Sequence, residues 1–477
     1  MSEPFPDNTI EDCYEVSNRL KETFKTGKTK SLEWRLEQLQ RLEDMVKDNK
    51  DLFIDALVAD LHRGRMDARL LDLFPFFEEI KYLKKHTKSL MKPRKVGTSM
   101  AFKPSSAYVQ PRPYGTTLVI APFNFPVMLS LGPLAGAISA GNCSILRPSP
   151  YTIETTALIC RLVPEYLDTD AIVVLAGEEL DVPLTTTLLA PDEACKIDFV
   201  FFTGSSTVGK IIARQCVERF IPYVLELGGE NPSIVTETAN LDVSAKRLCG
   251  KFFNASQICV APNYLMVHED VYEEFTFKYA YAVREVYGEN PQETEEFGRI
   301  IADRHFSRLK ALLDDALEKG ATPLLGGTYD EKERYMAPTL LEGVTPDMRI
   351  ANEEIFGPIL PIYKYSDIEE CVAYAQSKPP ALAAYVFSKD KHVIEQYLSQ
   401  IQAGGVCIND IISHVAVEEL PFGGVGKSGF GSYHGKQTFD CFSHLQSTLH
   451  RGWISLDSGK YPNRSNFDKW MVDFMTE

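Results

Sequence analysis

The first ninety residues interleave charged and apolar positions with the spacing of amphipathic helices. In SLEWRLEQLQRLEDMVKDNKDLFIDALVADLHR the apolar residues recur every three or four positions, the period of a helix with one buried face. The pattern predicts helices over residues 8–92. Residues 92–115 are basic and rich in turn residues, so we expect a loop there that leads into an extended arm.

Beyond residue 115, short β-branched runs alternate with helical segments. The runs are TTLVIAP, CSILRPS, AIVVLAG and KIDFVFFTG, and after residue 260 the alternation resumes with APNYLMVHED, MAPTLLEGV and ALAAYVFS. Strands that alternate with helices of this length form βαβ units and parallel sheets. The chain is therefore predicted to be an α/β protein with two α/β blocks and no fixed-period repeat.

Tyr114–Leu146 carries no charge and resembles a membrane span. Pro122, Pro126 and Pro133 interrupt it, and lipid would leave the backbone groups freed at such positions without partners. We expect a buried strand, a loop and a buried helix instead. The N-terminus has no apolar signal segment and the C-terminus no apolar anchor, which predicts a protein without a transmembrane anchor.

The composition of the chain indicates which classes of partner and which cellular compartment to expect. The chain of 477 residues has a formal net charge of −16, and an acidic chain is poorly suited to nucleic-acid phosphates. Its ten cysteines include no CxxC pair. Because no secretory signal is visible, they are predicted to be reduced thiols in the cytoplasm, with no metal site. We expect a small-molecule substrate and no nucleic-acid partner.

Two glycine-rich segments resemble phosphate-binding loops, but neither is a Walker A loop. In FFTGSSTVGKII, Gly204 and Gly209 have the required spacing, yet Ile211 stands where a hydroxyl must hold Mg²⁺. In PFGGVGKSGFG, Pro421 stands where the first glycine is required. The first segment is still a candidate phosphate or dinucleotide site at a helix N-terminus, and the second is predicted to be a structural multi-turn loop.

Three polar residues in apolar surroundings carry candidate chemistry. Cys259 lies in NASQICVAP, Glu226 ends an apolar strand before two glycines, and Asn124 lies between aromatic residues and prolines in APFNFPV. Taken singly, the cysteine could be a buried thiol and the asparagine a turn residue that caps backbone groups. Together they supply a thiolate that attacks a carbonyl carbon, an amide that stabilises the oxyanion and a desolvated carboxylate that activates water. With a dinucleotide site, this set indicates hydride removal from a thiohemiacetal.

Six motifs in order carry a resemblance to a known family. They are APFNFP, FTGSSTVGK, ELGGENPS, FFNASQICVAP, NEEIFGPILP and LPFGGVGKSGFGSYHGKQTFDCFSH. In sequence and spacing they resemble the aldehyde dehydrogenase superfamily. The last motif and the early GKTKSLEWRLEQLQRL are similar to its class 3 and fatty-aldehyde branch. The resemblance runs from about residue 15 to about residue 455.

The resemblance implies a role for each matched residue. Cys259 would be the nucleophile, Glu226 the base for deacylation and Asn124 the oxyanion donor. The implied contacts of an NAD(P)⁺ cofactor are Pro122, Phe123, Arg147, Gly204, Ser205, Val208, Leu227, Glu354 and Phe356. Phe125 and Met128 near Asn124 are candidate residues of the substrate pocket, and with Phe123 they favour an apolar aromatic or aliphatic aldehyde.

The resemblance also implies a five-stranded Rossmann-like cofactor domain, an α/β catalytic domain and a β-hairpin arm for dimer contacts. The expected bounds are 1–99 with 115–226 for the cofactor domain, 227–430 for the catalytic domain, 100–114 with 431–455 for the oligomerisation arm, and 456–477 for a C-terminal helical tail. We expect a homodimer, because the chain is similar to the dimeric branch.

The predicted tail carries one apolar helical stripe. Its members recur at helical spacing and are Phe467, Trp470, Met471, Phe474 and Met475. We expect this helix to pack on the body of its own chain or of its dimer mate. A role beside the substrate entrance or on a membrane surface is the alternative.

Several positions depart from the family pattern. RPSP at 147–150 stands where relatives have Lys-Pro-Ser-Glu; the lost carboxylate no longer repels a 2′-phosphate, and the arginine fork suits one. NADP⁺ is therefore expected to be at least tolerated, and a preference for it stays open. Glu230 replaces a lysine, Ser256 a glycine and Phe123 a tryptophan, and none of these changes removes a catalytic group.

Two other classes of protein are compatible with parts of this pattern. A cysteine hydrolase or thioesterase could use the same thiol and oxyanion hole without redox chemistry, and a binding protein could keep the fold without turnover. None of the nine histidines lies in a recognisable partner motif for a hydrolytic cysteine. The intact set of Cys259, Glu226 and Asn124 favours a dehydrogenase.

Overall fold

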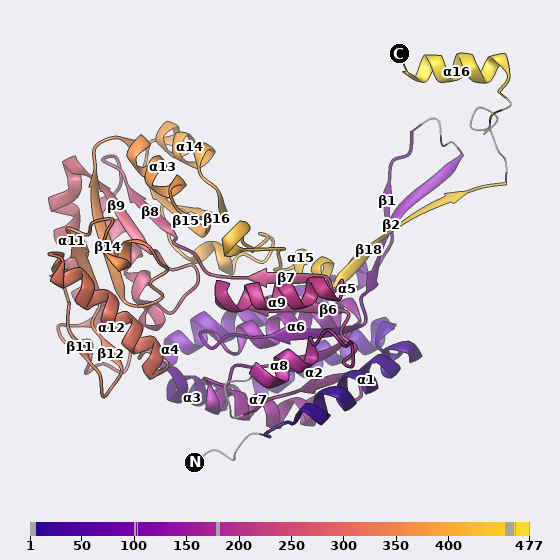
Figure 1. Ribbon diagram of the computed structural model, residues 1–477, viewed down its shortest axis with the longest axis horizontal. Helices are drawn as coiled ribbons and strands as arrows, with labels where there is room; N and C mark the ends of the chain where they lie inside the picture. The colour runs from indigo at the N-terminus through magenta and orange to yellow at the C-terminus, as the bar shows by residue number, and fades with distance from the viewer. Residues whose placement is uncertain are drawn as a thin grey trace.

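The computed structural model describes residues 6–99, 102, 104–177, 182–453, 462 and 464–476. Two α/β domains lie side by side, and an arm projects from the first of them (Figure 1). The predicted bounds 1–99, 100–114 and 456–477 include residues outside this description, namely 1–5, 100, 101, 103, 456–461, 463 and 477.

The N-terminal region is helical, as its pattern predicts. Its helices are α1 (Ile10–Thr26), α2 (Leu32–Asp48), α3 (Lys50–Leu61), α4 (Arg65–Ala68) and α5 (Phe74–Leu90). A π-helical stretch, Arg69–Leu73, joins the last two. Thr9 caps α1 in a capping box with Asp12, and Ser31 caps α2 by accepting from the N–H of Trp34.

The first domain is built on a six-stranded sheet with the order β17-β7-β6-β3-β4-β5. Five of these strands are parallel, as a Rossmann-like domain requires, and only β17 runs antiparallel. The strands are β3 (Thr116–Ile120), β4 (Cys143–Arg147), β5 (Ile172–Val174), β6 (Phe199–Thr203), β7 (Tyr223–Glu226) and β17 (Gly429–Phe430). The helices between them are α6 (Met128–Ala140), α7 (Ile153–Tyr166), α8 (Val182–Leu188) and α9 (Ser206–Glu218).

The uncharged segment forms the core of this domain. It supplies β3, a loop and α6, and every residue of α6 is buried. The predicted strand, loop and buried helix are thus confirmed. No helix among the described residues is both long and apolar enough to span a membrane.

The second domain has a seven-stranded sheet with the order β10-β13-β14-β9-β8-β15-β16, in which only β10 is antiparallel. Its strands are β8 (Pro232–Val235), β9 (Tyr264–His268), β10 (Thr322–Leu325), β13 (Thr339–Glu342), β14 (Ile359–Tyr365), β15 (Ala381–Phe387) and β16 (Ala403–Ile408). A separate ribbon pairs β11 (Tyr329–Asp330) with β12 (Tyr335–Met336). The helices are α10 (Leu241–Leu248), α11 (Tyr272–Tyr287), α12 (Asp303–Glu318), α13 (Ile368–Gln376) and α14 (Lys391–Gln400). The predicted mixed α/β fold is confirmed.

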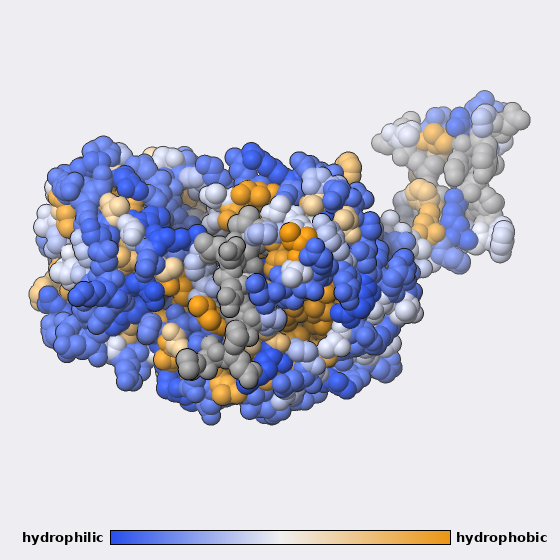
Figure 2. Space-filling model, turned by 60° about the horizontal axis from the view of Figure 1, so that its bottom comes forward, coloured by the Kyte–Doolittle hydropathy of each residue, from blue (hydrophilic) through white to orange (hydrophobic). Residues whose placement is uncertain are grey.

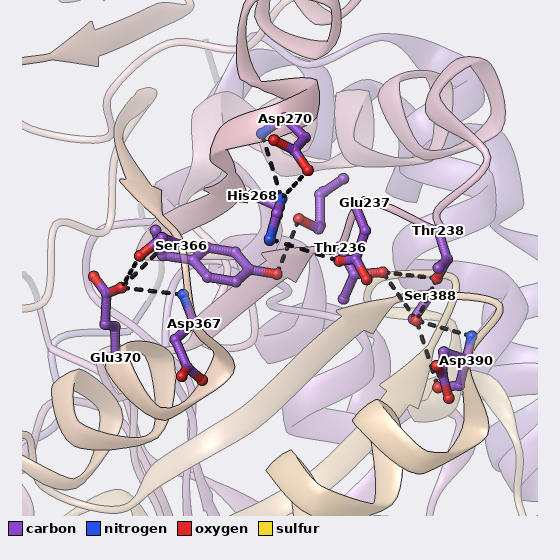
Figure 3. Close-up of polar contacts among 12 residues, drawn as sticks. Thr236, Glu237, Thr238, His268, Asp270, Ser366, Asp367, Glu370, Ser388 and Asp390 are labelled. Carbon is purple, nitrogen blue, oxygen red and sulfur yellow. Dashed lines mark hydrogen bonds and ion pairs between the residues drawn. The ribbon is translucent and has the colours of Figure 1, made fainter.

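The carboxyl ends of β8, β9, β14 and β15 carry a network of polar contacts (Figure 3). Two residues of the network cap helices: Asp390 accepts from the N–H of His392 at the start of α14, and Asp367 forms a capping box with Glu370 at the start of α13. His268 accepts from the N–H of Asp270. Among the described residues, no group of three or more His, Cys, Asp or Glu side chains is arranged to hold a metal ion. The network therefore explains helix starts at this edge of the sheet.

The arm is a three-stranded antiparallel sheet, which differs from the expected hairpin. Its order is β1-β2-β18, with the strands β1 (Arg94–Val96), β2 (Ser105–Pro113) and β18 (Ser443–Arg451). β18 pairs with β2 from Ser443↔Pro113 to Arg451↔Ser105. β1 thus belongs to the arm and not to the cofactor domain, because its backbone pairs with β2.

Two further predicted bounds need correction. Residues 431–442 do not lie in the arm, because α15 (Lys436–Cys441) packs on α5 and α6 of the first domain. The predicted catalytic domain also ends too late, since β17 pairs with β7 and so returns the chain to the first sheet.

The tail forms α16 (Asn466–Thr476), which lies beyond the arm and away from the body of its own chain (Figure 1). Phe467, Trp470 and Phe474 are exposed and their rings stack in sequence. The side chain of Met475 lies outside the description. In the space-filling view, the arm and α16 stand apart with apolar surface of their own (Figure 2). The expected packing on the body of the same chain is therefore not found.

Candidate active site

Cys259 lies on a tightly turned loop that leads into β9. The residues Asn254, Ala255 and Ser256 all adopt left-handed backbone conformations, with φ of 50°, 50° and 59°. The Ser256 hydroxyl donates to the carbonyl of Lys251 at 2.6 Å. Left-handed backbone is costly for residues with a Cβ, so this bond compensates for part of the strain of the turn.

Side chains from the second domain hold the main chain on both sides of the thiol. Asn231 Nδ2 donates to the carbonyls of Cys259 (2.8 Å) and Ala261 (2.9 Å). Tyr385 donates its hydroxyl to the carbonyl of Val260 at 2.6 Å. The position of the sulfur is thus set by a rigid backbone, as covalent catalysis requires.

Glu226 is the last residue of β7 and is 2% exposed. Neither of its carboxyl oxygens has a hydrogen-bond partner among the described residues. Burial therefore raises the pKa of this carboxyl well above its usual value. A buried carboxyl without a structural partner is suited to take up and release a proton.

The thiol of Cys259 lies in the same place, on a half-buried residue. Burial raises its pKa to about 12, and the negative charges of Glu354 and Glu226 act in the same direction. The three groups are therefore close enough to interact electrostatically. The thiol is protonated at rest, so a nucleophilic role requires that its proton be removed during the reaction.

Asn124 lies on the loop between β3 and α6 and is 3% exposed. Its carbonyl accepts from Asn254 Nδ2 at 3.0 Å and from Arg63 Nη1 at 3.3 Å. Its side-chain amide makes no hydrogen bond to the described residues, so the alternative of a capping turn residue is not observed. Because Asn254 belongs to the turn before Cys259, its bond to the Asn124 carbonyl links the loop of Asn124 to the loop of Cys259.

The predicted phosphate site is the N-terminus of α9. Ser205 is the N-cap and accepts from the N–H of Val208 at 3.3 Å, and both residues are exposed. Gly204 N–H donates to the carbonyl of Glu226 at 3.0 Å, which fixes the turn against β7. A Cβ on Gly204 would lie 2.6 Å from the Phe202 ring. The open end of this thirteen-residue helix fits a pyrophosphate.

Glu354 and Phe356 lie on a loop of the second domain that faces the cysteine. Burial raises the pKa of Glu354 to about 7, against the opposing effects of the Gly229 N–H and of two cations. Phe356 is left-handed (φ 48°), and its ring meets that of Phe123 edge-on at 6.0 Å. Arg308 supports the loop by donating to the carbonyl of Glu354 at 3.1 Å.

Other predicted cofactor contacts occupy different surroundings. Arg147 ends β4 and is 2% exposed, and its Nη1 donates to the carbonyl of Leu175. Its guanidinium is therefore directed inward and not toward the surface. Leu227 is buried beneath α9, where a Cβ on Gly209 would touch it, and Pro122 follows β3 at the half-buried start of the Asn124 loop.

The two predicted substrate-pocket residues lie close together but differ in their contacts. Phe125 is covered by the guanidinium of Arg63, 5.4 Å from the ring centroid. Met128 lines a small cavity with His434, which is buried. Burial lowers the pKa of His434 to about 3, so its imidazole is neutral.

Sequence patterns missed the residues that hold these loops. They are Arg63, Asp72, Asn231, Asn254, Arg308 and Tyr385. Asn231 and Asn254 stand within the motifs around Glu226 and Cys259, so their amides were detectable there. Arg63 and Asp72 lie in ordinary helical sequence and gave no signal.

A thiol held between two α/β domains, with a dinucleotide-type sheet on one side, defines a class: the nicotinamide-dependent oxidoreductases that act through a cysteine. The sequence model of the Aldehyde dehydrogenase family matches residues 3–448, so the chain belongs to that family. This confirms the family and the reaction class predicted from the motifs, the oxidation of aldehydes with NAD(P)⁺, and nothing supports the hydrolase alternative.

Known relatives agree over nearly the whole chain. The chain is 41% identical over 437 residues to the 4,4′-diaponeurosporen-aldehyde dehydrogenase of Staphylococcus aureus, covering 91% of this chain and 93% of that protein. It is 36% identical to the dimeric NADP-preferring aldehyde dehydrogenase of Canis lupus familiaris, covering 94% and 97%. A structure of Staphylococcus aureus AldH in a substrate-bound state superposes with a TM-score of 0.91 at 39% identity, covering 98% and 100% of the chains.

Proposed function

We propose that this aldehyde dehydrogenase oxidises an apolar aldehyde through a thioester on Cys259, with Asn124 as oxyanion donor and Glu226 as base. One observation carries the proposal. The buried carboxyl of Glu226 lacks a hydrogen-bond partner among the described residues, yet its charge acts on the Cys259 thiol. A carboxyl kept unpaired beside a thiol is expensive to bury and has no structural role.

The chemistry follows from these residues. The Cys259 thiol loses its proton to solvent, and Sγ then attacks the carbonyl carbon of the aldehyde to form a thiohemiacetal anion, whose oxyanion accepts from the Asn124 amide. NAD(P)⁺, when bound, supplies the acceptor for the hydride that leaves this carbon. Glu226 then takes a proton from a water that attacks the resulting thioester, which releases the carboxylic acid and frees the thiol.

The substrate class is inferred from the loop around Asn124. Phe123 stands in an aromatic cluster with Tyr151 and His305, and Phe125 and Met128 follow on the same loop. His305 is neutral in this cluster because burial lowers its pKa to about 4. The aromatic and apolar side chains of this loop favour an aromatic or aliphatic aldehyde.

For the cofactor, we infer that NADP⁺ is accepted and is a candidate for the preferred form. Pro150 leaves no carboxylate to repel a 2′-phosphate, and the canine relative is named NADP-preferring. Because the guanidinium of Arg147 is directed inward, the inference that NADP⁺ is accepted depends more on the absent carboxylate at position 150 than on Arg147. The kcat/KM ratio of NADP⁺ to NAD⁺ should fall in Pro150→Glu; an unchanged ratio would contradict the inference.

We further propose a homodimer in a reducing compartment such as the cytoplasm. No disulfide joins any of the ten cysteines, all of which lie among the described residues. The strand β16 is an open sheet edge with Val406 and Ile408 exposed, and β18 is another with Leu445 and Leu449 exposed. Open apolar sheet edges are normally covered in native proteins. A second copy of the chain would cover the edges at β16 and β18 by pairing its own strands with them.

The reaction is tested by offering the enzyme a panel of aldehydes and a chromogenic ester. Formation of the reduced cofactor is measured by its absorbance. Cys259→Ala should abolish aldehyde oxidation while cofactor binding and the fold persist, because the covalent path is lost and the cavity made is only one sulfur in size. Cys371→Ala is the matched control, since Cys371 is a buried thiol of the same domain on α13. Cys259→Ala activity within tenfold of wild type would overturn the mechanism.

A further inference from the structure

Arg63 and Asp72 form a fully buried ion pair in which Arg63 Nη2 donates to Asp72 Oδ2. Both side chains are 0% exposed. Arg63 follows α3, and Asp72 lies in the π-helical stretch before α5. Burying two charges is costly even when they are paired, so the pair calls for a reason beyond stability.

Both members of the pair extend to the loop that carries Asn124. Arg63 Nη1 donates to the Asn124 carbonyl at 3.3 Å, and the guanidinium packs over the Phe125 ring. Asp72 Oδ1 accepts from the N–H of Met128 at 2.6 Å. The pair therefore holds this loop at two points, at Asn124 in its middle and at the first residue of α6.

A third group reaches the same carbonyl from the cysteine loop. Asn254 Nδ2 donates to the Asn124 carbonyl at 3.0 Å and to the Gln257 carbonyl at 3.3 Å. The Asn124 main chain is thus fixed by donors from the N-terminal helices and from the loop of the nucleophile. Its side-chain amide has no such bond among the described residues, so its direction depends on the backbone that carries it.

We propose that Arg63 and Asp72 are positioning residues, which orient the Asn124 amide toward the oxyanion formed at Cys259. The inference rests on the oxyanion role proposed above and deepens it. An oxyanion donor acts only if it is aligned before the reaction, because reorganising it during the reaction costs part of its effect. Loss of the pair should therefore slow the chemical step and leave cofactor affinity unchanged.

The first measurement compares single-turnover rates of reduced-cofactor formation from hexanal by stopped flow. Arg63→Met should slow this step about tenfold, part of the roughly 10²- to 10³-fold effect of one oxyanion donor. Arg63→Lys keeps the charge opposite Asp72, but a lysine cannot donate to Asp72 and to the Asn124 carbonyl with the planar geometry of a guanidinium. Its single-turnover rate should therefore lie between those of the wild type and of Arg63→Met. The KM of NADP⁺ should stay within about twofold in both variants.

Arg35→Met is the matched control. Arg35 is also a buried arginine (4% exposed) beside α6, but it donates to the Ser139 carbonyl near the other end of that helix. Its removal should leave the chemical rate within about twofold of wild type. A loss as large as that of Arg63→Met would mean that general loosening of the domain causes the effect, which would overturn the proposal.

The second measurement repeats the Arg63 variants in an Asn124→Ala background. If Arg63 acts through Asn124, the extra loss there should be under about twofold, because the group that Arg63 orients is already gone. An equal factor in both backgrounds would overturn the positioning role while the oxyanion role stands. A normal chemical rate in Asn124→Ala would instead overturn the oxyanion role, and the positioning role with it. If Arg63→Met does not fold, the same comparison of the two backgrounds is made with Arg63→Lys.

Discussion

At the scale of single residues, burial and not pairing with other groups sets the pKa values of the proposed reactive groups. The pKa values of Glu226 and Cys259 are both raised because each group is buried, and the Glu226 carboxyl has no partner among the described residues. The Cys259 thiol therefore holds a proton at rest, and the base form of Glu226 appears at higher pH than that of an ordinary carboxyl. The proposed mechanism needs the thiol proton to leave before acylation and the base form of Glu226 during deacylation, which makes the rates of the two half-reactions separable.

Glu226→Gln should spare acylation and slow deacylation. We expect a burst of about one equivalent of reduced cofactor per site, followed by slow turnover, because glutamine cannot take a proton from water. The deacylation rate of the wild type should rise with pH, since the raised pKa of Glu226 means that its base form appears only at higher pH; in the variant this rise should be lost. Quenched-flow and pH-rate measurements test both points. An equal loss in burst and steady phases would assign the base elsewhere.

His434 provides a test of burial by pH. Its folded pKa of about 3 lies below the unfolded value near 6.5, so below pH 6.5 the unfolded chain binds the extra proton and the folded state loses stability. Between pH 6 and 4, the stability of the wild type relative to His434→Gln should fall by about 1.4 kcal/mol per pH unit. Urea unfolding at several pH values measures the difference. A difference independent of pH would show that His434 is protonated in the fold.

At the scale of elements, the turn before Cys259 shows where sequence reasoning stops. The strands and most helices follow from periodicity, because burial of one face repeats along the chain. The conformation of Asn254–Ser256 does not, since these three left-handed residues are held by a local bond from Ser256 to Lys251 and by a long-range bond from Asn254 to Asn124. The proposed catalytic residues could be chosen from motifs, whereas Arg63 and Asp72 could not, because their contacts join parts of the chain that are far apart in sequence.

This turn also explains the serine that replaces a family glycine. Ser256→Ala should lower the free energy of unfolding by about 1–2 kcal/mol, because it keeps the left-handed Cβ and leaves the buried Lys251 carbonyl without its donor. Ser256→Gly should cost less, since glycine relieves the backbone strain. Thermal or urea unfolding of both variants gives the order. A glycine variant less stable than the alanine variant would contradict this explanation.

At the scale of the whole molecule, the open edges predict the assembly. Light scattering at micromolar concentration should give twice the mass of one chain. Leu445→Glu with Leu449→Glu on β18 should shift the protein toward the monomer, because charges on an exposed apolar edge block strand addition. Leu52→Glu, at a similarly exposed leucine on α3, is the control and should leave the dimer intact. A wild-type monomer would contradict the assembly.

The pairing of β2 with β18 also sets an order of events during synthesis. β2 ends at residue 113 and β18 begins at residue 443, so the first strand leaves the ribosome long before its main partner is made. Domains generally fold as units while translation proceeds, and here both α/β sheets except the short β17 can close before β18 exists. Until then β2 has only the three residues of β1 beside it. The arm is therefore the last sheet of the chain to form, and association through it must wait until translation is nearly complete.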